Sequence, residues 1–471
     1  MIRHIIYFEW KNIKSNKAII WIASIFFLLM LFSTYDGYQN IKCQKENITK
    51  FRKGEKEKFE NLLADIDKVE SGVKKVNVYN NPKTPYLVGG KLANHKLIKE
   101  PDGLSLISVG QSDFFPYNYN ISLRNKYLYS FLMGDDKMEN PVNQLYGHFD
   151  PAFVLIWLLP LFVIAFSYNI LSSEREQGTL KLLKAQPVSI TKVLIVKALL
   201  RFVIIIGLMA VSVGVPLSLF GVSIIDNITA LVNLFSIICA YVLFWFLVSV
   251  LINLFNKSSS INAGILFTIW LILILITPTL LNIVANYKYP VPSRIELVNI
   301  IREATYEIDN NTNKILGEYF FDHPELVSMK SEKSMADWVY KNTLKNMIAK
   351  TASDSIVKQY KNQYNKQIGY INHWKYFSPA IILQQALDKL SGNSTKDFLK
   401  FQTKADEYND KWRMYFFDKI FKDELLSKND ILDLPKYSYR PKTDANIISY
   451  ILYILAYCGM AGGLIFLRNL Q

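Results

Sequence analysis

The side chains best placed to do chemistry lie in one short charged stretch between two apolar runs. Glu174, Arg175 and Glu176 are followed by Gly178 and Thr179, and the stretch continues as LKLLKAQP. Two carboxylates can act as general acid and general base when both face one substrate. Residues two positions apart on a helix do not share a face, so these two glutamates are poor candidates for such a pair. Acidic groups at a helix start, facing water or a partner protein, are the favoured interpretation.

No other pattern in the sequence indicates catalysis or metal binding. The five histidines fall in unrelated segments, and the three cysteines are too scattered for a disulfide framework. The sequence has no HExxH motif, no GxSxG nucleophile elbow and no GxxxxGK[ST] phosphate-binding loop. We therefore expect the chain to bind no cofactor and no metal. If it performs work on ATP, another subunit must supply the hydrolysis.

The composition indicates a membrane protein with large polar segments. Hydrophobic residues make up 51% of the 471 residues and charged residues 20%, an unusual combination for a soluble domain. The chain has 54 Lys and Arg against 40 Asp and Glu. These basic residues are spread over tails, loops and the edges of apolar runs, which fits anchoring at a membrane surface better than nucleic-acid binding.

Six apolar runs are long enough to cross the hydrocarbon core, which takes roughly 20 helical residues. We predict spans at 18–35, 151–170, 193–219, 230–254, 260–284 and 446–467. The first run could instead be a cleaved signal peptide, but no small-residue cleavage site follows it before Asp36. Lys197 and Arg201 begin the third span, and we expect their charged ends to extend back to the headgroups. The spans otherwise hold almost no ionisable residue, which argues against an ion-coupled carrier.

The remaining segments complete the predicted organisation. Residues 1–17 are apolar and basic on partly separate faces, as is typical of a helix lying in the membrane interface. Residues 171–192 form the charged loop, and the ranges 220–229, 255–259 and 468–471 are two short connections and a tail.

Two large polar segments remain, 36–150 and 285–445. In the first, apolar residues at helical spacing predict an amphipathic helix over 46–71, followed by loops and short strands. The second is predicted to be mostly helical, with Trp374 and Phe377 among the aromatic residues of its core. The predicted fold class is therefore a mainly α polytopic membrane protein with six transmembrane helices, a mixed α/β first polar segment and a mostly helical second one.

Basic residues in the short connections predict the orientation. The N-terminal tail, the 171–192 loop, Lys257 and Arg468 fall on one side of a six-span arrangement. Because short loops rich in Lys and Arg stay in the cytoplasm, we expect both chain ends there. Both large polar segments are then extracytoplasmic.

The run LSSEREQGTLKLLKAQPVSITKVLIVKALL resembles the first cytoplasmic loop of ABC-2 type transporter permeases. That loop typically carries E-x-E-x-G-T-L, then a proline, then a lysine opening the next span. The matching positions here are Glu174, Glu176, Gly178, Thr179, Leu180, Pro187 and Lys197. The runs 101–116, 140–153 and 374–387 resemble the subfamily with two large external segments, a domain of unknown function in ABC permeases. Together these motifs cover most of the chain.

The resemblance implies the six-helix fold of ABC-2 and ABCG-like exporters and a permease subunit in the bacterial cytoplasmic (inner) membrane. A cytoplasmic ABC ATPase dimer, which uses ATP and Mg, would drive it. The 171–192 loop would dock in a cleft of that ATPase. The implied coupling residues are Glu174, Arg175, Glu176, Gly178, Thr179, Leu180 and Leu183. Two permeases, identical or different, would pair across a pathway between their second and fifth spans.

Several alternatives stay open at this stage. The external segments either pack together to cap the pathway or engage a substrate or an envelope partner. The whole chain could instead be a membrane receptor or scaffold that binds a ligand outside and recruits a partner inside without transport. A membrane-embedded hydrolase lacks a catalytic constellation in the sequence. The substrate and the direction of transport do not follow from the residues.

Overall fold

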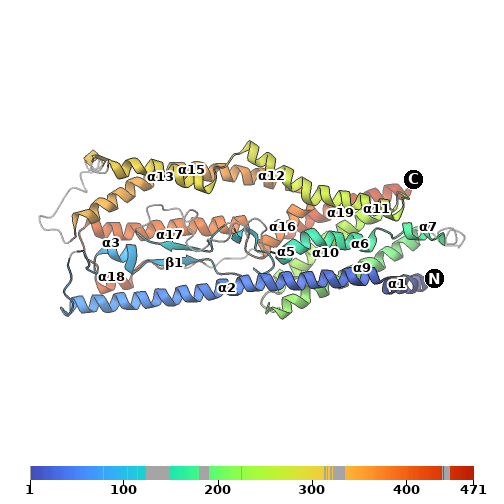
Figure 1. Ribbon diagram of the computed structural model, residues 1–471, viewed down its shortest axis with the longest axis horizontal. Helices are drawn as coiled ribbons and strands as arrows, with labels where there is room; N and C mark the ends of the chain where they lie inside the picture. Colours follow the sequence, from blue (N-terminus) through green and yellow to red (C-terminus); the bar gives the residue numbers. More distant parts are fainter. Residues whose placement is uncertain are drawn as a thin grey trace.

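Six helices long and apolar enough to cross a membrane form one half of the molecule, and a polar body forms the other half (Figure 1). The computed structural model describes residues 2–77, 79–102, 104–113, 115–123, 149–179, 190–223, 225–311, 314–315, 317–318, 321, 335–437, 439 and 446–470. Both chain ends lie at the end of the apolar bundle that points away from the body. We call this end of the bundle, where both chain termini lie, the terminal end.

The six spans are single helices or helices interrupted by one π-helical segment. They are α2 (Lys17–Glu70); α5 (Pro151–Phe153), η3 (Val154–Leu158) and α6 (Leu159–Ser167); α9 (Ile190–Leu219); α10 (Ile228–Asn253); α11 (Ser259–Trp270), η4 (Leu271–Ile276) and α12 (Thr277–Lys288); and α19 (Ile448–Leu470). The fourth span, α10, packs against α6, α9, α11 and α19 and is the centre of the bundle. The predicted mainly α fold with six spans is confirmed.

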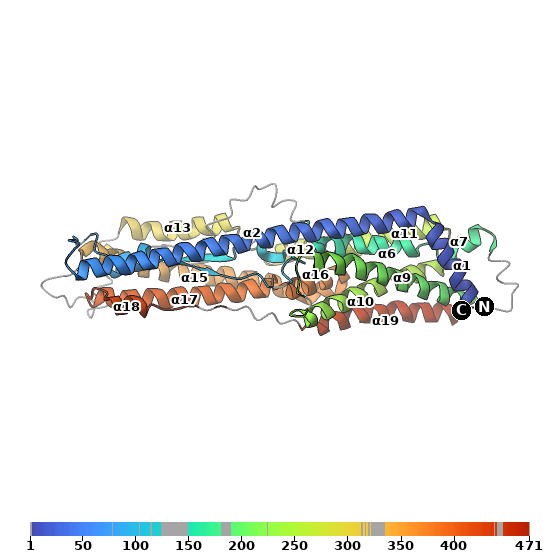
Figure 2. The same cartoon turned by 90° about the horizontal axis from the view of Figure 1, so that it is seen from below.

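The first span continues without a break into the body. A short helix, α1 (Ile2–Ser15), ends at Asn16, whose side chain accepts a hydrogen bond from the backbone N–H of Ala18 at 3.1 Å and so caps α2. Helix α2 has 54 residues and is roughly 80 Å long, at 1.5 Å per residue (Figure 2). The sequence analysis treated 18–35 and 46–71 as separate helices. They are joined because the residues between them contain no proline.

One glycine of α2 allows a close approach between the first span and the body. A Cβ atom at Gly37 would collide with the backbone carbonyl oxygen of Leu106, in the loop that follows the hairpin's first strand. Only glycine fits such a contact. This contact fixes the 104–113 segment against α2 just beyond the membrane half.

In the second span, side chains of neighbouring helices bond to backbone carbonyls near Pro160. Pro160 has no N–H to donate to Ile156, and the carbonyl of Ile156 instead accepts from the Tyr241 hydroxyl at 3.1 Å. The next carbonyl, that of Trp157, accepts from the Trp270 indole N–H at 3.1 Å. This is how a proline is accommodated in an apolar environment.

The body is a helical layer around a two-stranded hairpin. Strand β1 (His95–Ile98) runs antiparallel to β2 (Asn118–Ile121), with Leu97 opposite Tyr119. Its other elements are α3 (Pro85–Leu87), η1 (Val88–Leu92), η2 (Gly110–Asp113), α13 (Arg294–Asn310), α15 (Asp337–Trp374), η6 (Lys375–Phe377), α17 (Thr395–Phe421) and α18 (Lys428–Leu432).

The core of the body forms where the far half of α2, the hairpin and α17 meet. Ile66, Leu97, Trp412 and Phe416 are all almost completely buried there. The expectation that Trp374 and Phe377 belong to this core is wrong: their side chains are 37% and 59% exposed. They lie at the junction with the bundle, where the end of α15 reaches the spans.

Helix α16 (Pro379–Leu390) also joins the body to the spans. Ile382, Leu383, Ala386 and Leu387 are buried in the same core as the spans, against α10, α19 and the two π-helical segments. Ser378 precedes α16 and is fully buried. Its hydroxyl donates to the carbonyl of Leu273 in η4 at 2.6 Å.

A buried polar cluster lies beside α16. The hydroxyl of Ser108 donates to Asp388 at 2.6 Å, and the Gln384 amide donates to the same carboxylate oxygen at 2.7 Å. Asp150 accepts from the backbone N–H groups of Val109 and Phe153 at 2.9 and 2.8 Å. The described parts of the runs 101–116, 140–153 and 374–387, which carried the family resemblance, meet here. Burial, the largest cause, raises the pKa of Asp388 to about 7.

Candidate functional site

The charged stretch between the second and third spans begins with a short helix at the terminal end. Helix α7 (Ser172–Glu176) stops at Gly178, which has a φ of +73° and donates from its backbone N–H to the carbonyl of Arg175 at 3.1 Å. This left-handed conformation favours glycine. A Cβ atom at position 178 would meet nothing within 4 Å, so the backbone conformation alone restricts that residue. Leu180 and Leu183 lie outside the described residues.

Glu174 faces the third span. Its carboxylate forms an ion pair with Lys197 of α9 and also accepts from the hydroxyl of Thr179. The Thr179 hydroxyl lies 3.0 Å from the backbone carbonyl of Glu174 as well, so the chain after α7 folds back onto the helix. Glu174 therefore ties the end of the second span to the start of the third.

Glu176 faces the fifth span. Its carboxylate accepts from the backbone N–H of Ser259 at 2.6 Å and from the hydroxyl of the same serine at 2.8 Å. Ser259 is the first residue of α11, and a carboxylate is stabilised at the positive end of a helix. Arg175, between the glutamates, donates to the backbone carbonyl of Lys257. The two carboxylates thus bond to different helices.

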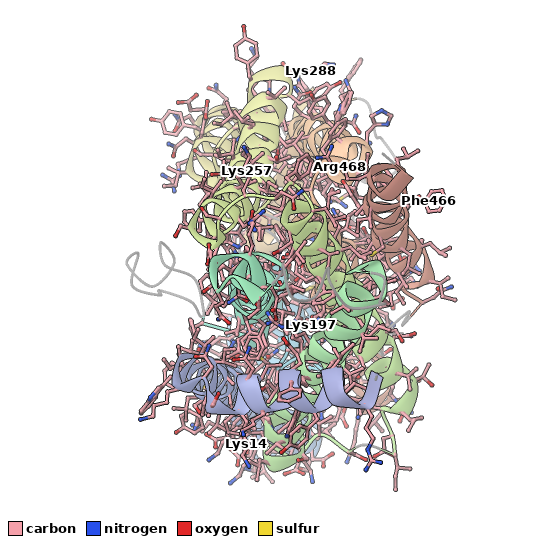
Figure 3. All side chains as sticks on the ribbon, turned by 90° about the vertical axis from the view of Figure 1, so that its right-hand side faces the viewer. Lys14, Lys197, Lys257, Lys288, Phe466 and Arg468 are labelled. Carbon is pink, nitrogen blue, oxygen red and sulfur yellow. The ribbon has the colours of Figure 1, made fainter. Side chains whose placement is uncertain are left out.

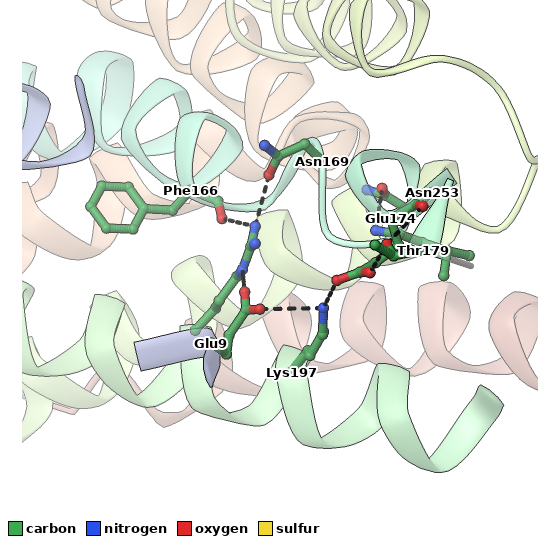
Figure 4. A network of polar contacts seen from close by, with 9 residues as sticks. Glu9, Phe166, Asn169, Glu174, Thr179, Lys197 and Asn253 are labelled. Atoms are coloured by element: carbon green, nitrogen blue, oxygen red, sulfur yellow. Dashed lines mark hydrogen bonds and ion pairs between the residues drawn. The ribbon is translucent and has the colours of Figure 1, made fainter. Parts of the chain in front are cut away.

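A buried ion pair between α1 and α9 lies next to this stretch (Figure 4). Arg201 Nε donates to a carboxylate oxygen of Glu9 at 2.6 Å, and Lys197 Nζ is 3.4 Å from the other oxygen. Arg201 also donates to the carbonyl of Phe166 at 2.9 Å and to the side-chain oxygen of Asn169 at 2.8 Å. Glu9 is 3% exposed and Arg201 4%.

This arrangement corrects two sequence-based expectations. Lys197 and Arg201 do not extend to the headgroups, because Glu9 and Glu174 hold their charged ends inside the protein. The third span also contains a buried arginine, although the spans were expected to lack one. Sequence reasoning missed Glu9. Its signal was that it is the only acidic residue within the basic segment 1–17.

Two buried asparagines complete the contacts at this end. Asn253 of α10 donates to the carbonyl of Ser167 at 3.0 Å and accepts from the backbone N–H of Leu171 at 3.3 Å. Asn262 of α11 donates to the carbonyl of Tyr168 at 3.4 Å. The carbonyls of Ser167 and Tyr168 lie at the C-terminal end of α6, where a helix has no backbone N–H to pair with them, and the two asparagines supply donors instead.

We refer to Glu9, Glu174, Glu176, Lys197 and Arg201 as the brace. It joins α1, α7, α9 and α11, and its geometry suits the transmission of movement between helices rather than bond chemistry. Within the described ranges, no group of three or more His, Cys, Asp or Glu residues is placed to hold a metal ion.

Residues 4–469 match the family model described as ABC-2 family transporter protein. The chain belongs to the ABC-2 family of transporter proteins. No curated protein and no solved structure matches it. An ABC-2 permease is the membrane-spanning component of a transporter, generally not catalytic itself, and membership implies partnership with an ABC ATPase. The brace of this ABC-2 permease lies around the loop that carried the resemblance.

Proposed function

We propose that this ABC-2 permease is an exporter subunit of the bacterial cytoplasmic (inner) membrane, driven by an ABC ATPase dimer that docks at α7. The terminal end faces the cytoplasm in this proposal, and the body is extracytoplasmic. Lys14 in the last turn of α1, Lys257 just before α11 and Arg468 in the last turn of α19 belong to the terminal end, which supports this orientation under the positive-inside rule. Figure 3 shows the molecule from that end. The ATPase uses ATP and Mg, and the permease binds no cofactor. Export is the direction that the family resemblance implies.

The single observation that carries the coupling proposal is the brace. Helix α7 is bonded to the third span through Glu174 and to the fifth span through Glu176. A displacement of α7 by an ATPase would therefore move α9 and α11 together with α6. Bistable packing of helices converts small shifts of this kind into larger rearrangements.

The proposal divides the coupling residues into two groups. Glu174, Glu176 and Arg175 bond within the chain, so they transmit movement. Gln177 and Gly178 are exposed at the tip of α7 and would contact the ATPase, together with Leu180 and Leu183 of the following segment. Thr179 fixes the loop against Glu174.

The pairing of two permeases, identical or different, is proposed along the second and fifth spans. The fifth span, Ser259–Lys288, is strongly apolar and only 11% of its most apolar window is buried in the single chain. A second permease would cover this surface. The two spans contact α16 through η3 and η4, and Ser378 bonds to η4, so their movement would reach the body through α16.

An experiment on the complex of the tagged permease with its ATPase separates docking from transmission. Spin labels at position 199 of α9 and position 255 of the turn between α10 and α11, both exposed, report the distance between the third span and this turn with and without ATP and Mg. We expect an ATP-dependent change that Glu176→Gln abolishes while the ATPase still co-purifies. Glu174→Gln should also abolish the distance change without loss of the ATPase. Gln177→Trp, in contrast, should reduce co-purification of the ATPase. The proposal is wrong if no ATPase co-purifies, or if Glu176→Gln leaves the ATP-dependent change intact.

A further inference from the structure

An apolar groove of about 760 Å³ opens at the terminal end between α1, α2 and α9. Its lining residues come from α1, α2 and α9, together with Phe166 of α6. The side chains that shape it most are Trp10, Ile13, Ile20, Phe27 and Leu208. It is a concave apolar slot of the size that holds an extended hydrophobic ligand.

The groove has a positively charged rim. Lys14 lines it, and Lys11, Lys17 and Arg3 lie in the same segment. The one carboxylate there, Glu9, is already bonded to Arg201 and Lys197. Lys14 therefore gives this edge of the groove a positive charge, and Glu9 is engaged with other cations. A ligand that fits has a long apolar part and an anionic end.

We propose that this groove binds an acyl chain of one anionic phospholipid, with the lipid phosphate at Lys14. Its lining includes exposed apolar side chains of α2 and α9, such as Ile20 and Val211, which bilayer lipid would contact. Helix α1 lies across the end of the bundle that faces the viewer in Figure 3. A basic interfacial helix attracts anionic lipids. The assignment of this lipid to the cytoplasmic leaflet rests on the proposed function. The existence of the lipid site does not depend on that function.

The position of the lipid gives it a regulatory effect. Phe166 lines the groove, and its backbone carbonyl accepts from Arg201 at 2.9 Å. Ile13, one turn from Glu9 on α1, forms part of the wall. An acyl chain in the groove holds α1 against α9 and thereby stabilises the Glu9–Arg201 pair. Because a ligand that binds only the folded state raises stability, anionic lipid stabilises the brace.

The test uses the purified full-length chain in detergent, without the ATPase, and measures bound lipid by native mass spectrometry. Phosphatidylglycerol and phosphatidylcholine with identical acyl chains are compared. We expect the wild type to retain phosphatidylglycerol several-fold better and to gain thermal stability from it. Lys14→Glu should reduce its retention to the level of phosphatidylcholine. Ala23→Phe, which fills the groove from α2, should reduce the retention of both lipids.

The matched control is Lys257→Glu, the same charge change on the other side of the terminal end (Figure 3). It should retain lipid like the wild type. An equal loss in Lys257→Glu and Lys14→Glu would show diffuse attraction and overturn the site. Unchanged retention in Ala23→Phe, or in the milder Ser24→Leu if the former does not fold, would also overturn it. Disulfide-linked dimers of Ser24→Cys would assign the groove to a second copy instead.

Discussion

Arg201 carries its charge at a position that is only 4% exposed, and its bonds reach separate parts of the chain. Glu9 lies on α1, Phe166 on α6 and Asn169 in the turn after α6. A buried ion pair adds little net stability, because both charges lose their hydration, but it restricts which arrangement is stable. Arg201 therefore specifies how α1 sits on the bundle.

Replacing Arg201 alone should lower the free energy of unfolding far more than replacing Arg201 and Glu9 together. Arg201→Met leaves the Glu9 carboxylate buried beside Lys197 only, and we expect a loss of about 3–5 kcal/mol in the free energy of unfolding. The double variant Glu9→Gln with Arg201→Met should recover a large part of it. Unfolding in mild detergent, analysed as a double-mutant cycle, measures the difference. A single variant as stable as the double would contradict the assignment.

Protonation of Asp388, at the junction between bundle and body, should make the stability of the folded chain depend on pH. Burial raises its pKa to about 7, and the neighbouring carboxylate of Asp150 adds to the effect, although Ser108 and Gln384 donate hydrogen bonds that oppose it. At pH values between about 4 and about 7 the folded chain binds this proton and the unfolded chain does not.

The stability contributed by this proton should consequently fall as the pH rises from about 4 to about 7. Asp388→Asn cannot ionise, so its melting temperature should show a smaller decrease across that range than that of the wild type. Thermal unfolding of both proteins in the same detergent and buffers measures this. A constant difference in melting temperature over the range would show that Asp388 does not titrate there.

Among the elements, the second and fifth spans are set apart by their π-helical segments, η3 and η4. Each is followed by a proline, Pro160 or Pro278, and each contacts α16. Segments of π-helix inside α-helices are frequently found at functional sites. Side chains on other elements, Tyr241 and Ser378, bond to the carbonyls that are left free. These spans have the weakest internal backbone bonding at the depth where α16 meets them.

Removing the Tyr241 hydroxyl should destabilise the second span. Tyr241→Phe leaves the carbonyl of Ile156 without its donor, and we expect a cost of about 0.5–2 kcal/mol, the range found for hydrogen bonds between membrane helices. Thermal unfolding in detergent measures it against Tyr79→Phe, which removes an exposed hydroxyl on the body. Equal melting temperatures for the two variants would contradict this role.

The elements were predicted well where the pattern is local. Apolar runs predicted the spans, and the second polar segment was predicted to be mostly helical, as α13, α15, α16 and α17 show. The sequence did not predict that α2 is continuous. The first part of α2 is apolar and its second part is amphipathic, and this change of composition predicts the end of a helix although the helical backbone continues through it. The sequence analysis also missed the Glu9–Arg201 pair, whose partners are 192 positions apart. A hydropathy pattern gives residue types and cannot show which distant charge neutralises which.

On the scale of the whole molecule, the two ends of the bundle have different contacts. The brace holds α7, α9 and α11 together at the terminal end, and α16 with Ser378 holds the spans at the opposite end. The described parts of the runs 101–116, 140–153 and 374–387 meet around Asp388 and Asp150. The sequence motifs did not predict that these runs converge on one buried cluster, because their order along the chain does not contain their distances in space.

The account predicts that an ATPase contacts α7 and no part of the body. A photocrosslinking amino acid at Gln177, exposed at the tip of α7, tests this in cells that contain the co-purifying ATPase. The matched control is Tyr287, which is 90% exposed at the opposite end of the fifth span. We predict covalent adducts with the ATPase from position 177 and none from position 287. Adducts from position 287, or their absence at position 177, would contradict the central claim.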